Sequence, residues 1–342
     1  MANEPQKLIE AKNLRKYFAV RRGAFGTTKK VVKAVDDVSF FIYHGETFGL
    51  VGESGSGKTT TGRLLLRGYE PTAGSAIYNF SDEESFDVMK LSKRELWKFR
   101  KHAQMIFQDP YSSLNPRMTV RDIIAEPLVA THSAEGDDVT ERLRETANRC
   151  QLSIEHLRRY PHAFSGGQRQ RIGIARALVL RPDFVVCDEP VSALDVSIQA
   201  QILNLLKDLQ KDLGLTYLFI AHDLSVVEHI CNRVGVMYLG NLFEMAQTQE
   251  LFHHPLHPYT EALMSAIPEA DPSIKMKPIQ LTGEIPSPID PPSGCSFHPR
   301  CGYAQDICSQ TKPEWVEQRP GHFVACHFAD TLELKGFVGA SK

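Results

Sequence analysis

The sequence predicts an α/β protein whose core is a largely parallel β-sheet. A glycine-rich segment at residues 52–59 separates an apolar, strand-like run from a helix-like run. From Pro182 onward, strand-like and helix-like runs alternate, which is typical of a parallel sheet flanked by helices. The chain has 342 residues, of which 42% are hydrophobic and 23% charged, and this is enough for a substantial folded core.

The first third of the chain is predicted to contain strands, the glycine-rich turn and a helix. Short runs of β-branched and aromatic residues predict strands within 8–20 and 31–51. The second run ends at the turn, and a helix is expected over 59–67. Residues 81–104 are charged and helix-prone.

The middle of the chain predicts a helical subdomain. Residues 121–160 carry apolar side chains at helical spacing, with breaks expected at Pro127 and around Gly136. The alternating region then predicts strands at 184–187, 216–220 and 234–239 and helices at 197–213 and 224–230.

The composition changes after about residue 250, where prolines interrupt every periodic pattern. We therefore expect two parts: a large domain at 1–250 and a C-terminal extension at 251–342. Four of the seven cysteines lie in the extension. The other three, Cys150, Cys187 and Cys231, are scattered through apolar or helical segments, which argues against a disulfide framework.

Charge and hydropathy exclude some classes of function. The net charge of −2 provides no global positive field, so nucleic acid is a poor candidate partner. No run approaches the roughly 18 uncharged apolar residues that span a bilayer, and residues 1–5 lack an apolar signal region. We expect the chain to reside in the cytoplasm.

The glycine-rich segment fits the pattern of a phosphate-binding loop, in which two glycines four residues apart precede Lys and Thr. Glycines let consecutive backbone N–H groups point at phosphate oxygens, Lys58 adds a cation, and the Thr59 hydroxyl is suited to Mg²⁺. The predicted nucleotide-binding residues here are Gly52, Ser54, Gly55, Ser56, Gly57, Lys58, Thr59 and Thr60. The pattern indicates a nucleoside triphosphate and Mg²⁺ but does not specify the enzyme class.

Two acids at the end of the apolar run 184–188 supply the rest of the chemistry. Functional residues of buried parallel strands lie at the carboxyl ends of those strands. There Asp188 can hold Mg²⁺, and Glu189 can act as the general base for the water that attacks the γ-phosphate.

Residues 164–171 resemble the signature sequence of ABC ATPases, with Phe164 where leucine is commoner. The resemblance implies that Ser165, Gly166, Gly167 and Gln168 face the ATP of an opposite subunit, so that two chains enclose two nucleotides. A serine and glycine N–H groups at a helix N-terminus suit this role.

Other elements of this family lie in the expected order. By resemblance, Gln108 would contact Mg²⁺ and sense the membrane partner, Asp195 would link the two active sites, and His222 would contact the γ-phosphate. Lys58 and Glu189 complete the catalytic set. Alignment favours Phe18 as the residue that stacks on adenine, with Tyr17 as the alternative.

Three longer strings, at 113–120, 187–197 and 257–260, resemble the ATP-binding subunits of dipeptide and oligopeptide importers. Nickel importers share much of the pattern. The resemblance implies a phosphate-loop ATPase with a RecA-like core, an antiparallel β subdomain, a helical signature subdomain at about 110–178, and a small C-terminal extension rich in proline and cysteine.

The resemblance also implies partners. These are a second, similar ATPase, two transmembrane permease subunits and, indirectly, an extracytoplasmic peptide-binding protein, with this chain peripheral at the cytoplasmic face of the inner membrane. Two alternatives are a soluble ABC ATPase that acts on ribosomes or DNA, and a regulatory subunit that binds ATP without hydrolysing it. A single cassette without a heptad run argues against the first, and intact Lys58, Glu189 and His222 argue against the second.

The C-terminal cysteines predict a metal centre. Four thiols within about thirty residues in a reducing compartment suit zinc or an iron–sulfur cluster better than a disulfide. The spacing lacks the close pairs of common zinc sites and resembles an extension that carries a [4Fe–4S] cluster in some peptide-importer ATPases. A metal-free thiol cluster is the main alternative and zinc, with His298 and His327 in reserve, is the third. The candidate ligands are Cys295, Cys301, Cys308 and Cys326.

Overall fold

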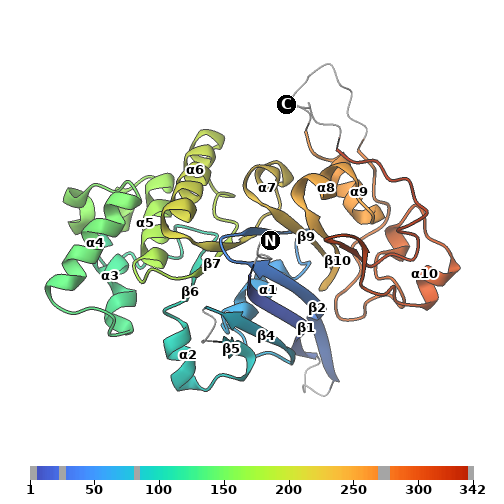
Figure 1. The fold of residues 1–342 in the computed structure, drawn as a ribbon, viewed down its shortest axis with the longest axis horizontal. Helices are drawn as coiled ribbons and strands as arrows, with labels where there is room; N and C mark the ends of the chain where they lie inside the picture. Colours follow the sequence, from blue (N-terminus) through green and yellow to red (C-terminus); the bar gives the residue numbers. More distant parts are fainter. Residues whose placement is uncertain (1–5, 23–27, 81–84, 269–277, 338–342) are drawn as a thin grey trace, which may run out of the picture.

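The structure, a computed structural model, describes residues 6–22, 28–80, 85–268 and 278–337. Its largest element is an eight-stranded sheet across the middle of the molecule (Figure 1). The strand order is β11 (Val316–Arg319), β12 (His322–Val324), β10 (Asn241–Gln247), β9 (Arg233–Tyr238), β3 (Thr47–Val51), β8 (Thr216–Ile220), β7 (Phe184–Asp188) and β6 (Ala103–Ile106). Strand pairs from β9 to β6 are parallel and the others antiparallel, so the predicted fold class is confirmed.

The four central strands are mostly apolar, as expected where helices cover both faces of the sheet. Every residue of β3, β7, β8 and β9 is buried. Helices α6 (Val196–Leu213), α7 (Leu224–Ile230) and α8 (Thr248–His253) lie above the sheet in Figure 1, and α1 (Lys58–Leu65) lies below it. The predicted strand at 216–220 and helix at 224–230 agree residue for residue with β8 and α7.

A second, antiparallel sheet lies below α1 in Figure 1. Its strand order is β2 (Thr28–Tyr43), β1 (Lys7–Arg22), β4 (Ala73–Asn79) and β5 (Ser85–Asp87). Its buried side chains share one hydrophobic core with Leu64 and Leu65 of α1. The sheet therefore supports the helix that follows the glycine-rich loop.

The prediction of a helix-prone stretch at 81–104 is mostly wrong. Residues 81–84 lie outside the described residues, and the rest holds β5, the 3₁₀ turn η1 (Val88–Lys90), the short helix α2 (Lys93–Phe99) and β6. A capping box between Ser92 and Glu95 starts α2. In the described part of this stretch, the charged, helix-prone pattern corresponds to an α-helix only at α2. Residues 103–106 instead form a parallel edge strand that pairs with β7.

The helical subdomain is at the left of Figure 1. It comprises α3 (Val120–Ala130), α4 (Asp137–Arg149), the 3₁₀ turns η2 (Ile154–Arg158) and η3 (Pro161–Ala163), and α5 (Gly166–Leu178). Gly136 precedes α4, as predicted, but Pro127 lies inside α3. Proline removes one hydrogen bond there, near the end of the helix, while buried Ile124 and Leu128 on either side hold α3 against the core.

The C-terminal extension continues the large sheet. Strand β12 pairs with β10, and β11 pairs with β12 at the edge. The extension also contains α9 (Pro258–Ser265), the 3₁₀ turn η4 (His298–Arg300) and α10 (Asp306–Gln310). The proposed division at residues 250 and 251 stays a prediction, and its segment 269–277 and the ends 1–5 and 338–342 lie outside the described residues.

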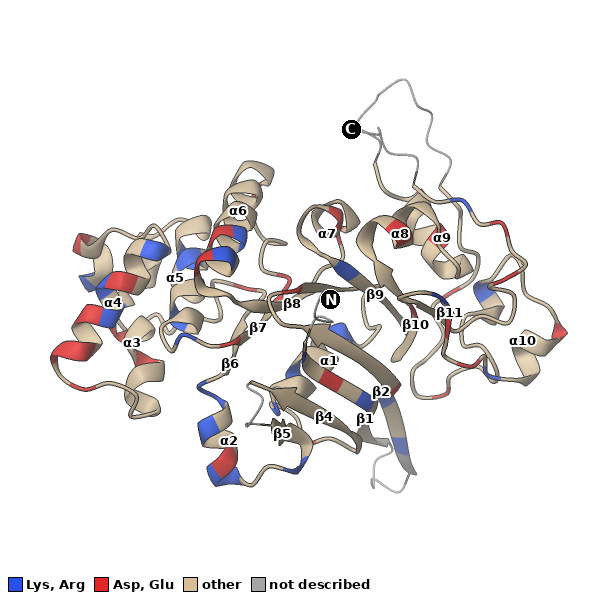
Figure 2. Cartoon of the chain, in the orientation of Figure 1, with Lys and Arg blue, Asp and Glu red and all other residues tan. Residues whose placement is uncertain are grey.

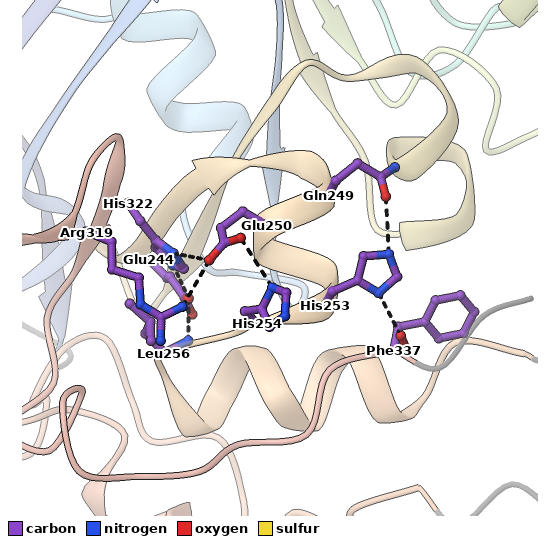
Figure 3. A network of polar contacts seen from close by, with 9 residues as sticks. All are labelled: Glu244, Gln249, Glu250, His253, His254, Leu256, Arg319, His322 and Phe337. Atoms are coloured by element: carbon purple, nitrogen blue, oxygen red, sulfur yellow. Dashed lines mark hydrogen bonds and ion pairs between the residues drawn. The ribbon is translucent and has the colours of Figure 1, made fainter. Parts of the chain in front are cut away.

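Hydrogen bonds to the buried carboxylate of Glu244 connect the C-terminal extension to β10 (Figure 3). Glu244, with no exposed surface, accepts hydrogen bonds from the backbone N–H of Leu256 at 2.6 Å and of His257 at 3.0 Å. It also lies 2.7 Å from Nε2 of His322 on β12. At the rim of this network, Arg319 forms an ion pair with Glu250 of α8 at 3.0 Å. We call these contacts the Glu244 network.

The surface mixes both signs of charge, as along α2 and α4 in Figure 2. Among the described residues, no helix has both the length and the apolarity to cross a bilayer.

Candidate active site

The glycine-rich loop joins the end of β3 to the start of α1, as predicted. Gly52, Gly55 and Gly57 have φ values of 142°, 79° and 103°, which L side chains rarely adopt. A Cβ atom on Gly52 would lie 2.1 Å from the Met237 carbonyl oxygen, and one on Gly57 would lie 2.3 Å from that of Ala34. The neighbouring backbone therefore requires glycine at these two positions.

Lys58 is the first residue of α1, and its almost fully buried side chain contacts the loop. Its Nζ donates to the carbonyl oxygens of Gly52 at 2.7 Å and Glu53 at 2.9 Å, and to Oγ of Ser56 at 3.3 Å. Burial lowers the pKa of Lys58, and nearby carboxylates oppose that change. Ser54 and Gly55 are exposed, and Thr60 is half-buried in the first turn of α1.

Thr59 and Asp188 meet although they are far apart in the sequence. The Thr59 hydroxyl donates to Oδ1 of Asp188 at 2.8 Å. Asp188 ends β7 and is 2% exposed, and burial raises its pKa while the bond from Thr59 opposes the increase. A hydroxyl beside a carboxylate is a donor set suited to Mg²⁺, so these residues fit the predicted metal site.

Two other predicted catalytic residues, Gln108 and His222, contact the Glu189 carboxylate. Gln108 Nε2 donates to Oε2 of Glu189 at 2.8 Å, and His222 Nδ1 lies 3.2 Å from the same oxygen. Glu189 has φ 45°, a strained conformation for a residue with a side chain, as occurs at functional sites. The structure thus brings three residues from three segments together at one carboxylate.

The signature residues lie on a different part of the chain. Ser165 accepts from the N–H of Gln168, whose side chain accepts from the N–H of Ser165, so the two form a capping box at the start of α5. A Cβ on Gly167 would lie 2.6 Å from Ile198 Cγ2, and one on Gly166 would lie 3.4 Å from Leu194. Among the described residues, no hydrogen bond or ion pair joins Ser165 through Gln168 to the phosphate loop.

Asp195 also faces outward at the start of α6. The next residue, Val196, is 82% exposed, which is unusual for an aliphatic side chain. The signature and Asp195 are therefore available to another molecule rather than to this chain's own loop.

The two candidate adenine-stacking residues have different surroundings. Phe18 is half-buried and meets the Tyr69 ring edge-on at 5.4 Å. The Tyr17 hydroxyl donates to Asp36, and burial raises the Tyr17 pKa to about 12. Since the Tyr17 hydroxyl is hydrogen-bonded to Asp36, the geometry favours Phe18 as the residue that stacks on adenine, in agreement with the family resemblance.

Three residues of the loop environment were not predicted. Arg300, in the extension, forms a two-point ion pair with Glu53, with Nη1 to Oε2 at 2.7 Å and Nη2 to Oε1 at 3.1 Å. The backbone N–H of Glu53 donates to the Tyr259 hydroxyl at 2.9 Å. Glu53 is one of the variable positions of the loop pattern, and Arg300 is 247 residues away, so no local signal pointed to this contact.

The four candidate cysteine ligands line one small pocket of the extension. We call this set, Cys295, Cys301, Cys308 and Cys326, the four-cysteine pocket. Backbone N–H groups of Phe297, Tyr303 and Phe328 donate to the first, second and fourth of these sulfurs. Burial raises the pKa of Cys295 to about 12 and of Cys326 to about 11, so the thiols favour the protonated form.

The pocket can be compared with what a zinc ion or an iron–sulfur cluster would require. Within the described ranges, no three His, Cys, Asp or Glu side chains are arranged to hold a metal ion of any kind. The rings of His298 and His327, the reserve ligands, bond to carbonyl oxygens of Cys295 and Thr311. The free space is about 20 Å³, so a cluster would have to widen the pocket.

Comparison with known proteins identifies the family. The family model for ABC transporters matches residues 35–192, and that for the C-terminal region of oligopeptide/dipeptide transporters matches residues 243–308. The oligopeptide transport ATP-binding protein AppF of Bacillus subtilis (strain 168) is 51% identical over 328 residues, covering 95% of this chain and 98% of AppF. The chain belongs to the oligopeptide-transport ATP-binding family of ABC transporters.

Solved structures agree with this family. The ATP-binding cassette MJ0796, in a dimeric post-hydrolysis state bound to ADP and Pi, matches with a TM-score of 0.60 and 27% identity over 70% of this chain and 98% of that chain. The cassette cbiO1 from Clostridium perfringens, part of the ABC transporter complex cbiONQ, matches with a TM-score of 0.60 and 25% identity over 72% and 91%. This ABC ATPase therefore binds ATP with Mg²⁺ and couples ATP hydrolysis to transport.

Proposed function

We propose that this ATPase powers the import of di- and oligopeptides. The observation that carries the proposal is the likeness to AppF along nearly the whole chain, which includes the C-terminal region. A nickel cargo is the alternative within the same class of transporter. The chain itself holds no cargo site in this account, because the membrane subunits carry the peptide.

In the proposed mechanism, the loop N–H groups and Lys58 hold the phosphates, and Lys58 exchanges its carbonyl partners for phosphate oxygens. Thr59 and Asp188 hold Mg²⁺, which would offset charge on the phosphates. Glu189 accepts the proton of the attacking water, while Gln108 and His222 fix the orientation of the carboxylate.

The outward-facing signature supports a shared site between two ATPase subunits. In this arrangement, Ser165, Gly166, Gly167 and Gln168 contact the nucleotide of the partner, and Asp195 links the two sites. Closure of the pair around ATP would drive the membrane subunits outward-facing, and hydrolysis would reset them. A chain without its partner would hydrolyse ATP slowly.

Exposed aromatic residues beside Gln108 support docking to membrane subunits. Phe107 is 41% exposed and Tyr111 59% exposed, and Arg176 packs against the Phe107 ring with 5.4 Å between the guanidinium carbon and the ring centroid. A docked membrane subunit would cover these side chains and could displace Gln108. The chain would then lie peripherally at the cytoplasmic face of the inner membrane, below two permease subunits.

Co-purification in mild detergent tests this function. The expected result is recovery of two membrane subunits and a second, similar ATPase with the tagged chain. Recovery with ribosomes or DNA alone would contradict the proposal and favour a soluble ABC ATPase. Peptide and nickel are separated by measuring which of them, with its binding protein, stimulates hydrolysis.

We further propose that the four-cysteine pocket holds a [4Fe–4S] cluster. Four thiols around one pocket, with backbone N–H groups aimed at three of the sulfurs, form a suitable donor set for thiolate ligation. The cluster would cross-link an extension that has little core of its own.

Anaerobic purification tests the cluster. About four iron atoms per chain and a broad absorption near about 400 nm are expected, and both should be lost in Cys308→Ser. An anaerobic preparation without iron and without this absorption would contradict the proposal, and a stoichiometric zinc content would replace it.

A further inference from the structure

The phosphate loop contains a carboxylate that is out of place in an anion-binding site. Glu53 directly follows Gly52, and its carbonyl oxygen accepts from Lys58. An unpaired negative charge at this position would repel the phosphates of ATP. Some other group must therefore neutralise Glu53 for the loop to bind anions well.

The C-terminal extension provides that group. The two-point geometry of the Arg300 pair matches the planar guanidinium to the carboxylate, and the Arg300 side chain is only 7% exposed. The Glu53 side chain is 25% exposed, so the pair is partly buried, and solvent screens it less than it would a fully exposed pair.

Arg300 is itself held in place by aromatic packing. It ends η4, and the preceding Phe297 ring lies 5.4 Å from the Tyr238 ring and 5.2 Å from the Tyr259 ring. The Tyr238 hydroxyl accepts from Arg300 at 3.3 Å. Tyr259, fully buried, accepts the backbone N–H of Glu53. The extension thus fixes both the charge and the backbone of one loop residue.

We propose that the C-terminal extension completes the nucleotide site, with Arg300 and Tyr259 as positioning residues that neutralise and orient Glu53 in the phosphate loop. These residues act through Glu53. The inference rests on ATP hydrolysis by this chain and is independent of the cargo.

A double-mutant cycle on the full-length chain tests this role. Arg300→Met leaves Glu53 uncompensated and is expected to weaken Mg·ADP binding about tenfold in isothermal titration. Glu53→Gln removes the charge that causes the defect. The double variant Glu53→Gln with Arg300→Met should therefore bind within about threefold of the unmodified chain.

Arg319→Met is the matched control, because it removes another arginine of the extension that pairs with an acid away from the loop. Its Mg·ADP affinity should be unchanged. In the assembled transporter, Arg300→Met should raise the KM for ATP and leave kcat nearly unchanged. Arg300→Lys keeps the charge but not the two-point geometry, so its Mg·ADP affinity should lie between those of the unmodified chain and Arg300→Met. This variant also provides a test if Arg300→Met does not fold.

Two results would overturn the proposal. One is unchanged Mg·ADP affinity in both Arg300→Met and Arg300→Lys. The other is an equal loss of affinity in Arg300→Met and in the double variant, since a purely structural role would not be rescued by Glu53→Gln.

Discussion

The phosphate loop and the four-cysteine pocket both gather groups that are suited to ligand binding, yet they are built differently. In the loop, backbone conformation and tight contacts set the shape: glycines with positive φ pack against carbonyl oxygens of β9 and β2. In the pocket, four thiols from α10 and from irregular segments line a free space of about 20 Å³. The comparison indicates that backbone packing fixes the shape of the loop, whereas the pocket would have to widen to hold a cluster.

The largest expected effect is at the catalytic carboxylate. Glu189→Gln should lower ATP turnover by the assembled transporter at least about 100-fold and leave ATP binding intact, because the amide cannot accept the proton of the attacking water. Glu228→Gln, the same change on α7, is the control and should keep full turnover. Normal hydrolysis by Glu189→Gln would show that another residue is the base.

A second prediction tests whether the backbone shapes the loop. Gly52→Ala places a Cβ 2.1 Å from a backbone oxygen and should destabilise the chain by more than about 3 kcal/mol and abolish nucleotide binding. Gly55→Ala, where the space is open, should cost only about 1 kcal/mol from its positive φ. Urea unfolding and titration with ATP measure both. Equal effects of the two substitutions would contradict a preformed loop.

The attachment of the extension should depend on the Glu244 network. Glu244→Leu leaves His322 and two backbone N–H groups buried without their partner, so the free energy of unfolding should fall by about 3 kcal/mol. Arg319→Met breaks a half-exposed ion pair of the same network and should cost less than about 1 kcal/mol. Denaturant unfolding distinguishes the two, and a similar cost for both would mean that burial does not decide the strength of this contact.

The smallest effect is expected in the four-cysteine pocket of the metal-free chain. Cys308→Ala should lower the stability of the metal-free chain by about 1 kcal/mol or less, since only one thiol is lost. In anaerobically prepared protein the same change should cost more, because it would also remove a cluster ligand. An identical cost in both preparations would contradict the idea that a ligand shapes this pocket.

The sequence correctly predicted those strands and helices whose residues follow a single hydrophobic pattern. The apolar strands before Gly52 and Asp188 and the helix after His222 have a clear period and clear ends, and the glycine, lysine and acid motifs lie on them. It failed where two influences compete. The run at 103–106 is short and lies beside charged residues, so β6 was missed, and Pro127 was taken for a break although burial of its neighbours keeps α3 intact.

Apart from the meeting of Thr59 and Asp188 at the expected Mg²⁺ site, contacts between distant segments were not predicted from the residues. Family resemblance placed Gln108 at Mg²⁺ and His222 at the γ-phosphate but did not predict their contacts with Glu189. The pairing of Arg300 with Glu53 had no signal in local pattern or spacing. Strands β11 and β12 were likewise hidden among prolines, because they are defined by pairing with β10 rather than by their own composition.

The most direct test of the account is the rate of ATP hydrolysis by the complete transporter in liposomes, with and without its peptide-loaded binding protein. Peptide is expected to stimulate hydrolysis several-fold, and Glu189→Gln in this chain should remove the stimulation. Hydrolysis by the isolated chain at the full rate, or a rate in liposomes that ignores peptide, would contradict it.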